Sequence, residues 1–131
     1  MPEVFNLVAV STLAAGTPVT SVPKMFASAR NRALADGLTG VMVFDGAGFC
    51  LCLEGEREVV LRCQEAARHD GRQTDIEPIF HELRAERRYN RFFTGYAMAE
   101  GLPASEELRA LDASTALHRF RELAADFDLN F

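Results

Sequence analysis

The sequence predicts an α+β fold: a sandwich with a five-stranded mixed sheet, two helices on one face, and further helices at the C-terminus. The first observation is the stretch 38–55, where two apolar runs flank Asp45-Gly46-Ala47-Gly48, the pattern of a β-hairpin with a glycine-containing loop. The second is that both runs are too apolar for strands with one wet face, so both faces of the hairpin should be covered. The third is that a helical pattern precedes the hairpin and another follows it.

The elements before the hairpin have recognisable boundaries. Residues 4–10 predict a first strand that ends at Ser11. Ser21 is a suitable cap for the helix that follows, and Pro23 stands in its first turn, where a missing N–H costs nothing. Gly37 supplies the stop, so this helix should end just before the hairpin.

The elements after the hairpin complete the sheet. A second amphipathic helix is predicted from 56 to about 69, followed by a turn at 70–73. A strand at 76–83 is interrupted by Pro78, which favours a position at the edge of the sheet. A last strand is predicted at 92–98. The order is βαββαββ, a ferredoxin-like plan with one strand more than the minimum.

Residues 1–100 are predicted to form this unit, and residues 101–131 a helical extension packed on the same domain. A short helix is expected from 105 to about 111, and Ser114 is expected to cap another. The terminal residues 126–131 are apolar enough to dock rather than fray. Because two helices cover only one face of the sheet, the C-terminal helices, a partner subunit, or both should cover the other.

Composition and charge limit the classes of partner. The chain has 131 residues, 48% of them hydrophobic and 25% charged, which suits one domain with a real core. A formal net charge of −5 provides no attraction to nucleic acid or to an anionic membrane. The N-terminus does not show the pattern of a secretion signal, and no apolar run has the length of a membrane span. Three cysteines inside apolar segments fit reduced thiols, so a cytoplasmic location is expected.

Three further motifs favour structural roles over chemical ones. Cys50 and Cys52 should share one face of a strand, but no other ligands cluster with them, so core packing is favoured over a metal site. Glu54 stands at a strand-to-helix junction, where a carboxylate serves the helix dipole or the turn, and no base–nucleophile pair accompanies it. The basic cluster 84–91 is expected to be a solvated hairpin loop rather than an RNA-binding surface. Neither an enzyme nor a metal site is expected.

Short motifs along the chain follow one another without gaps. They are a strand ending in Ser11, a helix, Gly37-Leu38-Thr39-Gly40, the hairpin, Phe49-x-x-x-Leu53-Glu54-Gly55, a second helix, Asp70-x-Arg72, and a final strand with Gly95-Tyr96-Ala97-Met98. This combination resembles the BLUF domain, the bacterial blue-light sensor that holds FAD between its two helices. The resemblance implies the fold derived above, with C-terminal helices on the free face of the sheet.

The resemblance also implies three side chains around the flavin ring: a tyrosine on the first strand, a glutamine on the third strand, and an asparagine on the first helix. Counted without gaps from the neighbouring motifs, these positions hold Ala9, Leu51 and Ala33. Alanine and leucine side chains donate neither an electron, a proton nor a hydrogen bond. The carbonyl and N–H groups of a flavin ring edge cost a few kcal/mol when they are buried without partners. We therefore expect the photocycle of the family to be absent.

The opposite end of the flavin site is retained. Asp70 and Arg72 match the Asp-x-Arg that the family places near the ribityl and phosphate part of the cofactor, although Gln73 replaces the histidine that follows. Met98 is also retained, beside Tyr96 at a position where the family usually has tryptophan. Asp70, Arg72 and Met98 are thus the cofactor-binding residues if flavin is bound.

Three functions follow from these observations. The leading one is a degenerate BLUF-like sensory or regulatory domain that binds no cofactor and acts as a protein-interaction module, as a homodimer, with a regulatory protein partner, or both. The second is an FAD-binding blue-light photoreceptor with altered ring contacts. The third is a binder of another small apolar ligand in the vacated cleft between the two helices.

Overall fold

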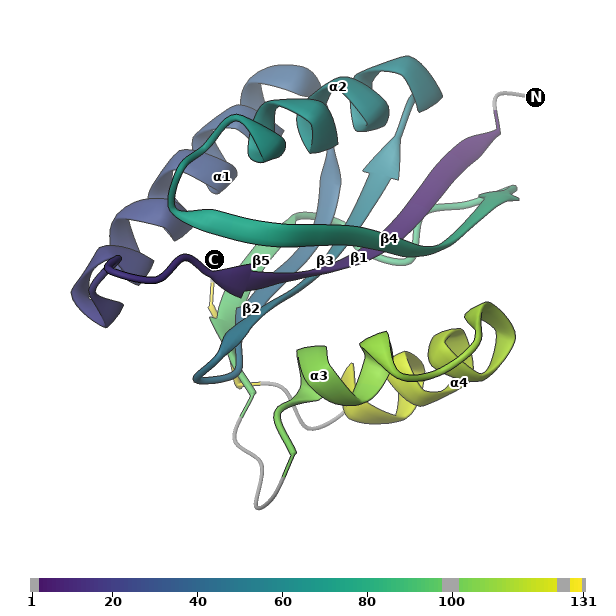
Figure 1. Ribbon diagram of the computed structural model, residues 1–131. Coiled ribbons are helices and arrows are strands. Elements are labelled where there is room, and N and C mark those ends of the chain that lie inside the picture. The colour runs from purple at the N-terminus through teal and green to yellow at the C-terminus, as the bar shows by residue number, and fades with distance from the viewer. Residues whose placement is uncertain (1–2, 98–101, 125–127, 131) are drawn as a thin grey trace.

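A mixed, six-stranded sheet lies at the centre of the computed structural model, which describes residues 3–97, 102–124 and 128–130 (Figure 1). The strand order across the sheet is β4-β1-β3-β2-β5-β6. In chain order the elements are β1 (Val4–Leu13), the 3-10 turn η1 (Val19–Ser21), α1 (Val22–Asp36), β2 (Thr39–Phe44), β3 (Gly48–Gly55), α2 (Arg57–Arg68), β4 (Gln73–Arg84), β5 (Phe92–Tyr96), α3 (Ala104–Arg109), α4 (Ala113–Ala124) and β6 (Asp128–Asn130).

The five predicted strands are confirmed, and the C-terminal extension adds a short sixth. β5 lies parallel to β2, and the other neighbouring strands are antiparallel. The hairpin joins β2 to β3 as predicted, and β6 pairs with β5 at the far edge. Gly40 lies where the backbone of β3 leaves no room for a side chain, because a Cβ there would collide with the carbonyl oxygen of Cys52. This contact explains the second glycine of the Gly-Leu-Thr-Gly motif.

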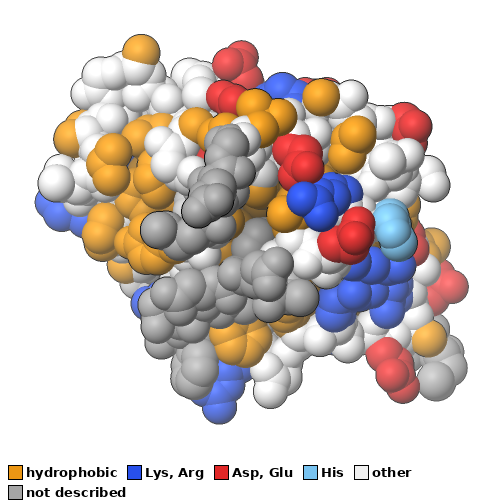
Figure 2. Space-filling model, turned by 90° about the horizontal axis from the view of Figure 1, so that it is seen from below, with side chains coloured by type: hydrophobic (Ala, Val, Ile, Leu, Met, Phe, Trp, Pro, Cys, Tyr) orange, Lys and Arg blue, Asp and Glu red, His pale blue; other side chains and the backbone are white. Residues whose placement is uncertain are grey.

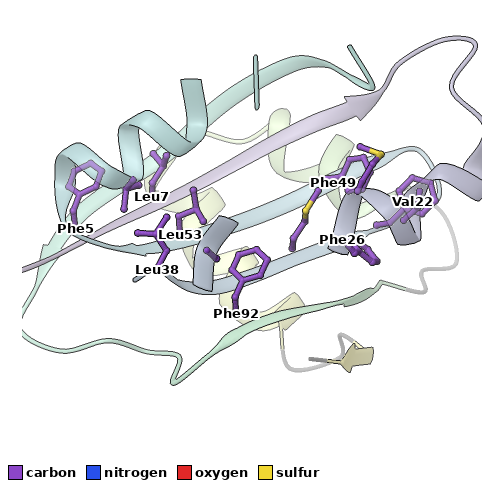
Figure 3. Packing of buried hydrophobic residues seen from close by; sticks show 13 residues of the cluster. Phe5, Leu7, Val22, Phe26, Leu38, Phe49, Leu53 and Phe92 are labelled. Carbon is purple, nitrogen blue, oxygen red and sulfur yellow. The ribbon is translucent and has the colours of Figure 1, made fainter. Parts of the chain in front are cut away.

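Helices cover both faces of the sheet, which confirms the prediction for the hairpin. In Figure 1, α1 and α2 lie above the sheet and α3 and α4 lie below it. The upper core is formed by alternate strand residues and the inner faces of α1 and α2, with Phe5, Leu7, Val22, Phe26, Leu38, Phe49, Leu53 and Phe92 labelled in Figure 3. The intervening strand residues point down and pack against α3 and α4 in a second core, which includes Val8, Val41, Cys50, Leu108 and Phe120. The C-terminal helices thus cover the face that α1 and α2 leave free.

The helix ends agree with the sequence in part. Gly37 ends α1 in the left-handed conformation, with φ of 70°, and Pro23 lies in its first turn, as predicted. Ser21 occupies the N-cap position, but its side chain makes no capping hydrogen bond. The prediction that Ser114 caps the last helix is wrong: α4 begins at Ala113, and the N–H of Thr115 donates to Oδ1 of Asp112 at 2.9 Å. Both residue types are good caps, and only the backbone path selects between them.

β4 runs along an edge of the sheet, which confirms the position predicted from Pro78. The prediction that Pro78 interrupts the strand is wrong, since β4 continues from Gln73 to Arg84. The register of its pairing with β1 shifts between Val8 and Ala9, and Pro78 is the partner of Ala9. The proline therefore lies at an irregularity of the hydrogen-bond ladder. A proline on an edge strand can direct its missing N–H away from the sheet, and the strand survives for that reason.

Candidate functional site

A cavity of about 270 Å³ lies between α1 and α2, above the middle of the sheet. Apolar side chains from the strands form its floor, and small side chains of the two helices form its walls. Its polar groups come from α1 and from the turn after α2. The lining residues are Met25, Ser28, Ala29, Arg32, Met42, Leu51, Leu53, Cys63, Ala66, Ala67, Asp70, Arg72, Gln73 and Phe92. This is the cleft in which the sequence predicts a ligand.

Two of the three residues predicted to replace flavin-ring side chains meet on neighbouring strands. Ala9 of β1 lies directly opposite Leu51 of β3 in the antiparallel ladder, which places their side chains on the same face. Leu51 lines the cavity, whereas Ala9 is buried, with 1% of its surface exposed. The floor below the cleft is therefore hydrocarbon at both of these positions.

Ala33 does not join them. It is buried against the upper core on the other side of α1, and it lines a separate cavity towards Gly37 and Phe92. The residues of α1 that face the inter-helix cavity are instead Met25, Ser28, Ala29 and Arg32. Sequence spacing placed Ala33 on the helix, but the rotation of the helix about its own axis determines which cavity a residue faces.

Asp70 and Arg72 form a paired group at the polar end of the cleft. The guanidinium of Arg72 donates through Nε to Oδ1 of Asp70 at 2.8 Å and through Nη2 to Oδ2 at 2.7 Å. The backbone N–H of Arg72 also donates to Oδ1 at 3.1 Å. These hydrogen bonds hold the pKa of Asp70 below its usual value. The Ser11 hydroxyl donates to Oε1 of Gln73 at 2.8 Å and fixes the next residue of the turn.

β5, which the sequence predicts as the last strand, contributes less to the cleft than the sequence implies. Tyr96 packs edge-on against Phe26 of α1, with ring centroids 5.6 Å apart, and does not line the cavity. Met98, the third residue predicted to bind the cofactor if flavin is present, lies outside the described residues.

The residues present do not fit the polar edge of an isoalloxazine. Ser28, Arg32, Asp70, Arg72 and Gln73 are the lining side chains with strong hydrogen-bonding groups, and Asp70 and Arg72 already bond each other. The strand residues of the floor have hydrocarbon or thioether side chains, so a ring edge buried against them would lose its partners at a cost of a few kcal/mol. The cavity volume is also just below the range of about 300–1,000 Å³ that is usual for ligand pockets.

Glu54 is completely buried and holds the connection between β4 and β5. Its Oε1 accepts from the hydroxyl of Thr39 at 3.1 Å and from the N–H of Tyr89 at 2.9 Å, and its Oε2 accepts from the N–H of Arg88 at 2.7 Å. The expected role in the helix dipole or the turn is therefore wrong. Nothing in the sequence near Glu54 indicates partners 34 and 35 residues away.

The basic cluster does not form a hairpin loop, because β4 and β5 are not neighbours in the sheet. The segment crosses the end of the sheet between them. Nη1 of Arg87 donates to the carbonyl oxygen of Glu54 at 3.2 Å and to the hydroxyl of Thr39 at 3.0 Å. This cluster is thus partly tied to the sheet rather than fully solvated.

The paired cysteines belong to the lower core. Cys50 and Cys52 are both buried, and burial raises the pKa of each thiol. The thiol of Cys52 donates to Oδ1 of Asn6 at 3.0 Å. Among residues 3–97, 102–124 and 128–130, no group of three His, Cys, Asp or Glu side chains is arranged to hold a metal ion. The same part of the chain contains no helix with the length and apolar character of a membrane span.

Comparison with known proteins adds the family context. The sequence profile of the BLUF family, described as sensors of blue light using FAD, matches residues 4–98. Among curated protein sequences, none matches this chain.

The fold is similar to those of several solved structures. BlrB, a BLUF protein in its dark state, is 23% identical, with 96% of this chain and 92% of that chain covered and a TM-score of 0.68. BlsA in its ground state is 21% identical, with coverage of 92% and 87% and a TM-score of 0.72. A bacterial light-regulated adenylyl cyclase is 22% identical with a TM-score of 0.66, and 91% of this chain matches 36% of that protein.

Proposed function

This chain belongs to the BLUF family of blue-light sensors, and from that membership we propose that it is a regulatory domain of the family that works without flavin photochemistry. In this proposal it binds no cofactor, catalyses no reaction, and acts through contact with a second copy of itself, with a regulatory protein, or with both.

The observation that carries the proposal is the pairing of Ala9 with Leu51 across β1 and β3. In the family these strands supply the tyrosine that donates an electron and proton and the glutamine that switches its hydrogen bonds. Hydrocarbon side chains at both positions support neither step. Ala33, at the asparagine position, contacts the upper core rather than the cleft.

The C-terminal helices are the favoured surface for an interaction. The face of the sheet that α1 and α2 leave free is occupied by α3 and α4, so a partner would contact the outside of these helices. Figure 2 shows this underside, where acidic and basic side chains are mixed on the right, the side on which α3 and α4 lie in Figure 1. A surface with charges of both signs suits a protein partner with complementary charges.

An absorption spectrum tests the proposal. The protein, expressed and purified with FAD supplied, should be colourless and should remain so after incubation with FAD. Flavin bands that shift to longer wavelength on illumination would overturn the proposal and establish the photoreceptor function. Size-exclusion chromatography with light scattering should then show a dimer, or a complex with a regulatory protein.

A gain-of-function variant tests the physical reason. Ala9→Tyr/Ala33→Asn/Leu51→Gln should increase FAD uptake, with most of the gain already present in Ala9→Tyr/Leu51→Gln because Ala33 lies away from the cleft. The control Ala9→Phe/Ala33→Leu/Leu51→Met has side chains of similar size without the polar groups, and it should show no gain. Equal uptake by the two triple variants would show that cleft size, not polarity, governs binding.

Two alternatives have support from specific contacts. The retained Asp70–Arg72 pair favours an FAD-binding photoreceptor with altered ring contacts. The apolar floor with Met42, Leu51 and Leu53 favours a different small apolar ligand in the same cleft. The absorption spectrum separates the first alternative from the proposal, and a colourless ligand extracted from the protein and identified by mass spectrometry would favour the second.

A further inference from the structure

A second cavity, of about 500 Å³, lies on the other side of α1 from the inter-helix cleft. It is bounded by the C-terminal half of α1, the residues before β2, and residues 90–92. Phe92 lines both cavities. The volume of this second cavity, unlike that of the cleft, lies well within the usual range for small-molecule pockets.

The charge of this cavity is positive. Arg30 and Arg91 both line it, and no acidic side chain does. Nη2 of Arg30 donates to the hydroxyl of Thr94 at 2.6 Å, which holds the guanidinium beneath α1. A guanidinium has five N–H donors and a permanent positive charge, and an oxyanion is the ligand that pairs with it most strongly.

The walls of the cavity are apolar. Leu38 and Phe92 are buried, and Leu34 stands at the rim with 82% of its surface exposed. An exposed leucine beside an arginine-lined pocket offers apolar contact to a ligand whose anionic end reaches inwards. A bare anion would leave these walls unused.

We propose that the second cavity binds a small amphipathic anion, with a carboxylate or phosphate head group on Arg30 and a short apolar body against Leu34, Leu38 and Phe92. This site is separate from the cleft and does not depend on the function proposed above.

Calorimetric titration of the full chain tests the proposal. Octanoate and octyl phosphate are the probes, and octanol is the neutral analogue of the same length. One of the two anions should bind saturably and at least about tenfold more tightly than octanol, since a charge-assisted hydrogen bond contributes about 1.5–3 kcal/mol and tenfold corresponds to 1.4 kcal/mol. The tighter anion identifies the head group as carboxylate or phosphate. Equal binding of octanol, or no binding of either anion at millimolar concentration, would overturn the proposal.

Matched variants locate the site. Arg30→Gln should weaken the anion at least about tenfold, whereas Arg32→Gln, two residues along the same helix but facing the cleft, should leave the affinity within about twofold. Unchanged binding in Arg30→Gln, or an equal loss in Arg32→Gln, would place the ligand elsewhere. If circular dichroism shows that Arg30→Gln does not fold, Leu34→Asn serves in its place, because an exposed residue can be changed without loss of the core. Anion affinity unchanged in Leu34→Asn would contradict the proposal.

Discussion

Glu54 illustrates how a buried charge is accommodated in this protein. Its carboxylate has no exposed surface, yet it accepts hydrogen bonds from a hydroxyl and two backbone N–H groups. Two of these donors are backbone N–H groups of the segment between β4 and β5, so the carboxylate fixes the path of that segment. The residue therefore joins the hairpin to the crossing segment before β5, although it belongs to a motif shared with light sensors.

Replacing Glu54 by glutamine should destabilise the fold. One carboxylate oxygen becomes an NH₂ group, which faces a donor instead of accepting from it, so the free energy of unfolding should fall by about 1–3 kcal/mol. Urea denaturation measures this change. The neighbouring Glu56→Gln is the control, because Glu56 is exposed and its side chain makes no capping hydrogen bond, and its effect should stay below about 0.5 kcal/mol. Equal stability of the two variants would show that the three hydrogen bonds to Glu54 contribute little.

Asp70 should make stability depend on acidic pH. Its pKa is lower in the folded protein than in the unfolded chain, so the pair stabilises the fold above the unfolded pKa and loses this contribution as pH falls through the folded pKa. In Arg72→Gln the pKa of Asp70, followed by NMR, should rise towards its ordinary value. The loss of stability at neutral pH should be at most about 1 kcal/mol, because the pair is partly exposed. Arg68→Gln is the control, and an Asp70 pKa that is the same in both variants would contradict the pairing.

Asp45 links two elements that are far apart in the sequence. Oδ1 accepts from the N–H groups of Ala47 and Gly48 in the turn between β2 and β3, at 2.9 and 2.8 Å. Oδ2 accepts from the N–H of Ser105 in the first turn of α3, at 2.6 Å. One carboxylate thus shapes the hairpin and anchors the C-terminal extension to it.

Asp45→Ala should loosen both elements together. Three N–H groups lose their acceptor, and the free energy of unfolding should fall by about 2 kcal/mol or more. Hydrogen exchange should accelerate at Gly48 and at Ser105 in the same variant. Asp36→Ala, which removes an exposed carboxylate at the end of α1, should leave both rates unchanged. Faster exchange at Gly48 alone would mean that α3 is held without Asp45.

The whole molecule is a three-layer assembly in which the central strands contribute to two cores. Along β3, Leu51 and Leu53 face the cleft and the upper core, while Cys50 and Cys52 face the lower core beneath them. The second core also contains Leu108 of α3, which is completely buried. The extension therefore completes the domain, and the two cores share a single sheet.

A chain that ends at residue 100 should not fold as a well-behaved monomer. Without α3 and α4, the lower side chains of the sheet, among them Val8, Val10, Val41 and Val43, would form an exposed apolar patch. We expect aggregation or dimerisation in light scattering, together with binding of a hydrophobic dye. In the full chain, Leu108→Ala weakens the packing of α3 on the sheet without removing the helix. The free energy of unfolding should fall by about 2–5 kcal/mol while the protein stays folded. A monomeric truncated chain with cooperative unfolding would show that the first 100 residues form an independent domain.

Local features of the chain were sufficient for most of the fold. The hairpin, both long helices, the stop at Gly37 and the edge position of β4 follow from periodicity, turn residues and proline, all of which act over a few residues. Spacing also predicted Ala9 and Leu51 as the replaced ring positions, and the structure shows that these two residues are paired across β1 and β3. The family follows from the same motifs.

Other features depended on which distant segments meet. The sequence alone could not pair Glu54 with Arg88 and Tyr89, place Asp45 at the start of α3, or assign Ala33 and Arg30 to a second cavity. It also could not choose Asp112 over Ser114 as a cap, since both suit the role. Periodicity and turn chemistry describe the chain near each residue, whereas these contacts arise only when helices and strands settle against one another, and that packing is a property of the folded molecule.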